Sequence, residues 1–354
     1  MTPVRLDTER RVEGFLGRLG DGVRGKILLD HPLSRLTTFR VGGAASVVFI
    51  PESPLEVEAA CRAAKKAGLP LKVLGRGSNV LASDQGFPGV VMLVVKRGFK
   101  DIRMDKCIVE VDAGLSLDRM VRWCAERGLA GMEGMAGIPG TMGGAVHNNA
   151  GARGSEISGV LREAYLFDGE GWSWVPAEGL GLAYRRSDVK GIIGKVRLEL
   201  REMGSEELMR AYAENLAWRR SSQPLSRHSA GSVFKNGEGY RAGELIDRCG
   251  CKGWRIGDAL VSEKHANFIV NAGRARSWQV LQLIEAVRAR VREETGIELE
   301  LEIELLGDFK AWGGEPAKRP GLPAGVSDGP HPRPAKSGER GPGGPGSGRR
   351  GKEG

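Results

Sequence analysis

The pattern of hydrophobic and polar positions changes repeatedly between a period of two and a period near 3.6, which predicts that strands alternate with helices. Short apolar runs of strand length lie at 45–50, 71–75, 89–95, 107–114 and 195–200. Helical spacing lies at 5–19, 53–68, 116–128 and 205–222. We expect a β-α-β unit over 45–75, with Leu55, Val57, Ala60 and Ala64 on one side of its helix.

A last unit closes the pattern. It is predicted to hold a helix at 241–250, a turn and strand at 259–271, and the longest helix at 277–296. Residues 297–307 ("IELELEIELLG") alternate apolar and acidic positions, which predicts a strand. Its four carboxylates would share one face, normally a solvated one: Glu298, Glu300, Glu302 and Glu304.

Length and composition indicate a globular protein. The 354 residues suffice for two or three domains, and 40% hydrophobic content is adequate for their cores. No apolar run is long enough to span a membrane, and the N-terminus lacks the apolar core of a secretory signal, so we expect a cytosolic protein. The five cysteines have no metal-ligand spacing, and we expect reduced thiols and no metal site.

The net charge of +9 raises the possibility of a nucleic-acid partner. Residues 312–354 contribute +4 of it, which leaves only +5 for the other 311 residues. This tail holds 13 Gly and 8 Pro in 43 residues, a composition that cannot bury enough apolar surface to fold. We therefore expect a disordered tail and only a mildly basic body.

Two glycine-rich stretches carry the first chemical signal: "LGRGSNVL" (74–81) and "AGIPGTMGGAVHNNAGARG" (136–154). Glycines let backbone N–H groups turn inward and approach a phosphate closely. Neither stretch is a Rossmann fingerprint or a P-loop. From spacing alone, phosphate binding and plain turns both stay open.

An ordered series of further motifs extends this signal: "TTFRVGGAA" (37–45), "GRGSNVL" (75–81), "AGIPGTMGGAVHNNAGA" (136–152), "YRRS" (184–187), "SAGSVFKN" (229–236), "KGWRIGDALVSEKHANFIVN" (252–271) and "GIELELEIELLG" (296–307). In this series the chain resembles the UDP-N-acetylenolpyruvoylglucosamine reductases, also called UDP-N-acetylmuramate dehydrogenases. The series spans about 270 of the 354 residues, so only the N-terminal helix and the tail lie outside it.

The resemblance implies an α+β fold, in which a two-subdomain FAD-binding region of the vanillyl-alcohol-oxidase/PCMH type precedes a smaller α+β substrate-binding domain. The expected division is an N-terminal helix at 1–20, an FAD-binding domain at 21–204 with subdomains at about 21–90 and 91–204, a substrate-binding domain at 205–308 and a disordered basic tail at 309–354. No room is left before the 205–222 helix for the extra tyrosine loop of some members, so we expect the loop-lacking subtype.

The resemblance also implies a cytoplasmic enzyme of peptidoglycan precursor synthesis, monomeric or weakly associated. It would bind FAD non-covalently, take hydride from NADPH and reduce UDP-N-acetylglucosamine enolpyruvate to UDP-N-acetylmuramate. By the same resemblance, the following residues hold FAD: Arg40, Gly42, Gly75, Arg76, Gly77, Ser78, Asn79, Ala136, Gly137, Ile138, Gly140, Gly144 and Ala145.

The reaction itself needs a fixed cation and a proton donor, because hydride addition to a vinyl ether leaves negative charge that spreads into its carboxylate. Arg185 suits the cation, since a guanidinium stays protonated and binds carboxylates with paired hydrogen bonds. Ser232, by itself an ordinary turn serine, is a weak acid that protonates only a strong base such as this carbanion. The resemblance makes Ser232 the donor and Glu302 a support for the cation or for a donor network, with Glu300 as the alternative.

Substrate contacts are expected from Tyr184, Lys235, Asn236, Arg255 and Gly257. Two positions depart from the family pattern, namely Asp258 and the pair His147-Asn148. The rival predictions are an FAD-dependent sugar oxidase of the same architecture and a basic nucleic-acid-binding protein that acts through its tail.

Overall fold

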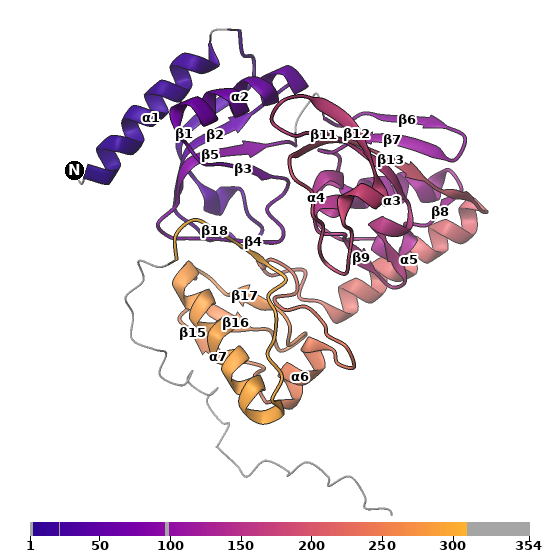
Figure 1. The fold of residues 1–354 in the computed structure, drawn as a ribbon. Helices are drawn as coiled ribbons and strands as arrows, with labels where there is room; N and C mark the ends of the chain where they lie inside the picture. The colour runs from indigo at the N-terminus through magenta and orange to yellow at the C-terminus, as the bar shows by residue number, and fades with distance from the viewer. Residues whose placement is uncertain (1–2, 21, 96–98, 310–354) are drawn as a thin grey trace, which may run out of the picture.

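A computed structural model describes residues 3–20, 22–95 and 99–309, which form three lobes packed around several hydrophobic clusters (Figure 1). The tail predicted to be disordered at 309–354 lies, from 310 on, outside the described residues. In the described ranges no helix is long and apolar enough to cross a membrane. All five cysteines are free thiols, as predicted.

The first lobe is a four-stranded sheet covered by two helices, α1 (Pro3–Leu19) and α2 (Pro54–Ala67) (Figure 1). In sheet order its strands are β1 (Lys26–Pro32), β2 (Ala44–Ile50), β5 (Phe87–Leu93) and β3 (Leu71–Leu74). Because β2 and β3 both run parallel to the intervening β5, the predicted β-α-β unit is confirmed. Helix α2 begins where the Ser53 hydroxyl accepts a hydrogen bond from the Glu56 N–H at 3.3 Å.

The prediction for the buried side of α2 was wrong at one position. Val57, Ala60 and Ala64 are buried, but Leu55 is 72% exposed. At about 100° per residue, Leu55 lies roughly 200° around the helix from Val57, on the opposite side.

The second lobe is a five-stranded antiparallel sheet, with α3 (Leu117–Glu126) and α4 (Met142–His147) packed into its core. In sheet order the strands are β12 (Trp172–Pro176), β11 (Leu161–Phe167), β13 (Ile192–Glu199), β7 (Ile108–Asp112) and β6 (Ile102–Asp105). Among the elements that sequence analysis missed are β1, β6, β11, β12 and α4.

Helix α5 (Ser205–Ser222) has the predicted bounds and connects the second lobe to the third (Figure 1). The third lobe packs α6 (Ala242–Arg248) and α7 (Ser277–Thr295) against a small sheet. That sheet contains β15 (Arg255–Ile256), β16 (Ala259–Val261) and β17 (Ile269–Asn271).

After α7 the chain returns to the first lobe, where β18 (Glu304–Leu306) pairs in parallel with β4 (Val80–Ala82). The strand predicted over 297–307 is therefore wrong for 297–303. That segment instead lies along residues 233–235: the Lys235 N–H donates to the Glu300 carbonyl at 2.9 Å, and the Glu302 N–H donates to the Val233 carbonyl at 2.8 Å. The return of the chain brings Glu302 to the junction of the lobes.

Candidate active site

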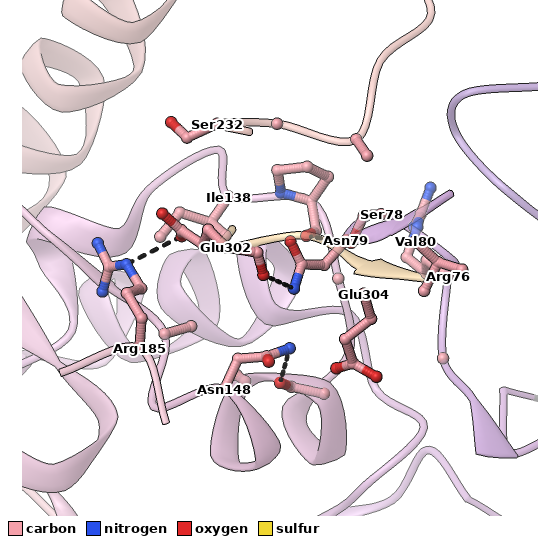
Figure 2. Close-up of a pocket in the computed structure, with 18 of the residues that line it drawn as sticks. Arg76, Ser78, Asn79, Val80, Ile138, Asn148, Arg185, Ser232, Glu302 and Glu304 are labelled. Atoms are coloured by element: carbon pink, nitrogen blue, oxygen red, sulfur yellow. Dashed lines mark hydrogen bonds and ion pairs between the residues drawn. The ribbon is translucent and has the colours of Figure 1, made fainter. Parts of the chain in front are cut away.

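A cavity of about 1550 Å³ lies where the three lobes meet, and all three contribute to its wall. Both predicted glycine stretches line it, and so do Arg185, Ser232 and Glu302 (Figure 2). A single drug-sized ligand typically fills about 300–1,000 Å³, so this cavity has room for a dinucleotide and a second molecule.

One wall is the loop between β3 and β4. None of the described residues accepts a hydrogen bond from the five consecutive backbone N–H groups of 75–79. Gly77 has a φ of +59°, and a Cβ there would lie 2.4 Å from the Leu36 carbonyl oxygen, so only glycine fits. The Thr38 N–H donates to the Gly77 carbonyl at 3.1 Å and fixes the loop. A row of free N–H groups in a fixed loop is a site for an anion.

The turn at 137–141 lies against this loop. The Ser78 hydroxyl donates to the Pro139 carbonyl at 2.8 Å, and a Cβ on Gly75 would lie 2.5 Å from Thr141 Oγ1. Thr141 Oγ1 also accepts from the Gly144 N–H at 3.2 Å and caps α4. The two glycine stretches thus form one continuous wall whose free donors belong to the backbone, which fits the pyrophosphate of the expected FAD.

Arg185 stands on another wall, held by three groups. Its Nε pairs with Glu302 Oε1 at 3.0 Å, Nη2 donates to the Gly151 carbonyl at 2.6 Å, and Nη1 donates weakly to the Asn149 carbonyl at 3.5 Å. Its backbone has a φ of +53°, a strained value for a residue with a side chain. The guanidinium is therefore fixed in direction before any ligand arrives.

Glu302 is mostly buried, with a side chain 21% exposed. Its carbonyl accepts from Asn79 Nδ2 at 3.1 Å, which ties it to the first glycine loop (Figure 2). Burial raises the pKa of Glu302 above its ordinary value, although Arg185 and Lys235 act in the opposite direction.

The four alternating glutamates do not share a solvated face, contrary to the prediction. Each has a cationic partner of its own, because the chain there is not a regular strand. The pairs are Glu298 with Arg288 and Arg292, Glu300 with Lys235, Glu302 with Arg185, and Glu304 with His147. Glu300 is 72% exposed and does not line the cavity, so the geometry favours Glu302 over Glu300 as the functional carboxylate.

Ser232 lies on a loop of the third lobe that faces the cavity (Figure 2). The loop is fixed at both ends: Thr38 Oγ1 donates to the Ser229 carbonyl at 2.7 Å, and the Val233 N–H donates to the Asn267 carbonyl at 2.9 Å. Among the described residues the Ser232 hydroxyl has no hydrogen-bond partner. A half-buried hydroxyl without a partner is not a turn-capping serine, and it is open to a ligand.

Two predicted substrate residues meet at the edge of the cavity. Asn236 Nδ2 donates to the Tyr184 hydroxyl at 3.2 Å, and Asn236 Oδ1 accepts from the Ala242 N–H at 3.0 Å. Both side chains are exposed and line the cavity wall. They are placed where a substrate could reach them.

Six predicted residues are not in the cavity wall: Arg40, Gly42, Ala136, Lys235, Arg255 and Gly257. Gly42 has a φ of +122°, and a Cβ there would lie 2.6 Å from the Ala82 Cβ, so the close packing of this loop requires glycine. Arg255 binds Asp258 at 2.6 Å within the third lobe. The two departures from the family pattern lie in different places. Asp258 pairs with Arg255 outside the cavity wall, whereas His147 and Asn148 line the cavity.

Sequence analysis missed several residues of the cavity wall: Thr38, Thr141, Arg153, Trp218, Arg219 and Ser229. Arg219 is only 7% exposed, and its Nε donates to the Ala136 carbonyl at 3.0 Å. Burial lowers the pKa of Arg219 to about 10. One signal in the sequence could have identified Arg219, namely the arginine pair 219–220 near the end of the 205–222 helix. Sequence analysis interpreted that helix only as a connector between domains. In the described ranges no three potential metal ligands group together.

Comparison with known proteins agrees with this site. Residues 45–171 match the model of an FAD binding domain, and residues 223–306 match the C-terminal domain of UDP-N-acetylenolpyruvoylglucosamine reductase. Two reductases of that name, from Syntrophotalea carbinolica and Heliobacterium modesticaldum, are 41% and 42% identical to this chain. The matches cover 82% and 80% of this chain and 97% and 92% of theirs.

Among solved structures, the crystal structure of UDP-N-acetylenolpyruvylglucosamine reductase from Thermus caldophilus is similar with a TM-score of 0.69 and 40% identity. The similarity covers 80% of this chain and 99% of that one. The predicted α+β fold, with an FAD-binding region followed by a smaller domain, is confirmed. The chain belongs to the UDP-N-acetylenolpyruvoylglucosamine reductase family.

Proposed function

We propose that this chain is the FAD- and NADPH-dependent reductase that converts UDP-N-acetylglucosamine enolpyruvate to UDP-N-acetylmuramate in peptidoglycan precursor synthesis. Family membership supports the reaction, since the chain spans nearly the whole length of its relatives. The observation that carries the proposal is the Arg185–Glu302 ion pair, in a cavity that the unpartnered Ser232 hydroxyl also lines.

The cofactor side of the cavity would be held by backbone. The N–H groups of 75–79 face no competing acceptor among the described residues and would bind the pyrophosphate of FAD. On the second turn Gly140 would add its N–H, whereas the N–H groups of Gly137 and Gly144 already donate to Asp118 and Thr141 and would shape the wall. When bound, FAD supplies the hydride that NADPH has given up.

Arg185 binds the enolpyruvyl carboxylate in this mechanism. Addition of hydride to the terminal carbon leaves an electron pair on the α-carbon, and the charge spreads into the carboxylate. The guanidinium is already held by Glu302 and the Gly151 carbonyl, so it stabilises this charge without having to reorganise.

Ser232 gives its hydroxyl proton to the α-carbon and completes the reduction. Two C–H bonds form, one from hydride and one from this proton, while the alkene π bond is lost. A serine hydroxyl is too weak an acid to protonate the carboxylate or the diphosphate, but a carbanion is basic enough to take its proton. Solvent then restores the proton to the serine oxygen. The free hydroxyl supports this role, because no described residue competes for its proton.

Glu302 is a positioning residue in this mechanism, since it holds Arg185 through Nε. Its buried position and its link to Asn79 set the distance between the reacting wall and the cofactor wall. Tyr184 and Asn236 would contact the substrate at the edge of the cavity.

The proposal also includes the roles of the domains, the subtype, the oligomeric state and the location of the protein. We assign substrate binding to 205–308 and FAD binding to 21–204, and the loop-lacking subtype because β14 (Arg201–Glu202) leads directly into α5. We expect a monomer or weak oligomer in the cytoplasm, where NADPH and the sugar nucleotide are made. We expect neither a membrane partner nor a specific nucleic-acid partner.

An anaerobic titration tests the function. The purified protein should be yellow, NADPH should bleach it, and the enolpyruvyl sugar nucleotide should restore the colour. Bleaching by a simple sugar would identify a sugar oxidase instead. A colourless protein that binds DNA or RNA in a salt-sensitive way, and loses this on truncation at Gly307, would identify the nucleic-acid alternative.

A further inference from the structure

A small hairpin beside Arg185 forms part of the cavity wall. Its strands are β9 (Gly151–Ala152) and β10 (Ser155–Glu156). At its base, the Gly151 carbonyl accepts the hydrogen bond from Arg185, and the Ser155 hydroxyl accepts one from the Gly134 N–H at 3.2 Å. Its tip is Arg153, whose φ of +48° is strained for a residue with a side chain. The hairpin is therefore fixed relative to Arg185.

The Arg153 guanidinium lies over the indole of Trp218 on α5, with its central carbon 4.9 Å from the ring centroid. Trp218 is 42% exposed, and both side chains line the cavity. Within 3–20, 22–95 and 99–309, Arg153 forms no ion pair with a carboxylate. Stacking on the indole holds a planar cation in place without neutralising its charge.

Four other cavity-lining cations are either paired with a carboxylate or not held in place. Lys252 is paired with Asp247 at 2.6 Å, and Arg241 with Glu244 at 3.4 Å. Arg76 and Arg227 lack a carboxylate among the described residues, but no described contact fixes their guanidinium groups.

Arg219 and Lys264 also line the cavity without a carboxylate partner among the described residues, and hydrogen bonds to the carbonyls of Ala136 and Arg220 hold them. Arg219 is only 7% exposed, however, and the ammonium group of Lys264 lacks the paired donors of a guanidinium. Arg153 differs from both because its guanidinium is exposed as well as held in place.

We propose that Arg153, stacked on Trp218, binds the diphosphate of the nucleotide that enters the cavity. The inference rests on the proposed function, in which the sugar nucleotide and NADPH both carry a diphosphate and use the same cavity. Arg185 takes the carboxylate, so the two remaining negative charges of the sugar nucleotide need a second cation in the cavity wall. A guanidinium presents paired N–H donors that match phosphate oxygens.

Binding of UDP and of NADP+ to the oxidised, FAD-loaded protein tests this inference, with calorimetry as the readout and uridine as the phosphate-free probe. Arg153→Ala should weaken binding of UDP and NADP+ by about 10- to 100-fold, the loss of a charged hydrogen bond, and leave uridine unchanged. A loss with UDP alone assigns Arg153 to the sugar nucleotide, and a loss with NADP+ alone assigns it to the reductant.

The matched control is Arg162→Ala, which removes the same charge from an exposed arginine that pairs with Glu199 at 4.0 Å and does not line the cavity. It should change either affinity by less than about twofold. Trp218→Phe keeps an aromatic ring with a weaker attraction for the guanidinium, and should weaken UDP binding by about two- to fivefold.

Unchanged binding of both UDP and NADP+ by Arg153→Ala, or an equal loss in Arg162→Ala, would overturn the inference. The FAD absorbance of each variant reports its folding. Bleaching by saturating NADPH and recolouring by the enolpyruvyl substrate are measured on the same samples. The proposed function fails if the unmodified protein shows neither change, whereas the inference fails on the affinities alone.

Discussion

The two long walls of the cavity differ in the groups that they offer to a ligand: one offers backbone groups and the other offers side chains. The cofactor wall offers the backbone N–H groups of 75–79, in a loop whose shape depends on glycine at position 77, and the turn at 137–141 packs against this loop. The reacting wall offers the side chains of Arg185, Ser232 and Glu302, which come from three distant segments. On the cofactor wall, the backbone conformation should determine how tightly the cofactor binds. On the reacting wall, the chemical identity of single side chains should determine the reaction rate.

The walls are also fixed differently. Loop 75–79 is held by contacts with neighbouring turns, such as Thr38 to Gly77 and Ser78 to Pro139. Glu302 owes its place to the last crossing of the chain, from α7 back to β18, and to the Asn79 amide. Substitutions on the two walls should therefore separate cofactor affinity from reaction rate.

The largest effect after loss of the proton donor is expected at the ion pair. Arg185→Lys and Glu302→Gln should slow flavin reoxidation by the enolpyruvyl substrate by about 10²- to 10³-fold, because the fork that stabilises the developing charge is lost or misdirected. Stopped-flow absorbance after pre-reduction measures this rate. FAD content should be unchanged, and a matching loss of bound FAD would contradict the separation of the walls.

Gly77→Ala should weaken the binding of FAD, in contrast to the substitutions at the ion pair, which should slow the reaction. The substitution adds a Cβ 2.4 Å from the Leu36 carbonyl at a φ of +59°, so the loop must shift and its N–H groups lose their direction. FAD affinity, measured by fluorescence on reconstitution, should fall by about 10- to 100-fold. Arg76→Ala in the same loop removes a large exposed side chain but no backbone donor, and it should bind FAD nearly normally.

The pH dependence of reoxidation tests the environment of Glu302. Because burial raises its pKa, the carboxylate takes up a proton at a higher pH than an exposed glutamate does. Protonation breaks the ion pair with Arg185, so the rate should fall on the acidic side, at a pH above the ordinary 4.5. Glu302→Gln should be slow at every pH and lack this acidic limb, and a limb retained in that variant would assign it to another group.

The smallest effect is expected at the pair of His147 Nε2 with Glu304 Oε1, 3.2 Å apart and about half-exposed. The bond to Glu304 raises the pKa of His147 above 6.5, so its stabilising contribution is complete below pH 6.5 and is lost as pH rises through the raised pKa. The bond to His147 lowers the pKa of Glu304, whose contribution is lost as pH falls through that lowered pKa.

His147→Gln should therefore lower the free energy of unfolding at pH 6 by about 0.5–1 kcal/mol and leave it unchanged at pH 9. Chemical denaturation at the two pH values measures the difference. His31→Gln, on β1, is the matched control. An equal loss at both pH values would show that His147 contributes packing rather than charge.

How much of the site could be predicted depended on how local its signal was. The glycine loops and Ser232 lie in short motifs, and the sequence was sufficient to find them. Glu302 and Glu300 are equivalent in a period-two pattern, so only the path of the chain separates them: one meets Arg185 and the other meets Lys235 at the surface.

Other positions were less accessible to local patterns. Arg40 and Gly42, predicted to hold FAD, belong to a loop with positive φ values that packs against Ala82 and lies outside the cavity wall, so their assignment stays a prediction. Arg153 and Trp218 are contributed by a hairpin and a helix more than 60 residues apart, and no local pattern connects them. The fold class was predictable from periodicity and motifs, whereas contacts between lobes were not.

The most direct test of the account is the effect of Ser232→Ala on the two half-reactions, followed by stopped-flow absorbance of the flavin. Reduction by NADPH should proceed at the normal rate, because it needs no proton on the α-carbon. Reoxidation by the enolpyruvyl sugar nucleotide should be slower by at least about 10³-fold, since the proton donor is lost. Equal slowing of both half-reactions, or normal reoxidation, would contradict the assignment of Ser232 as the acid.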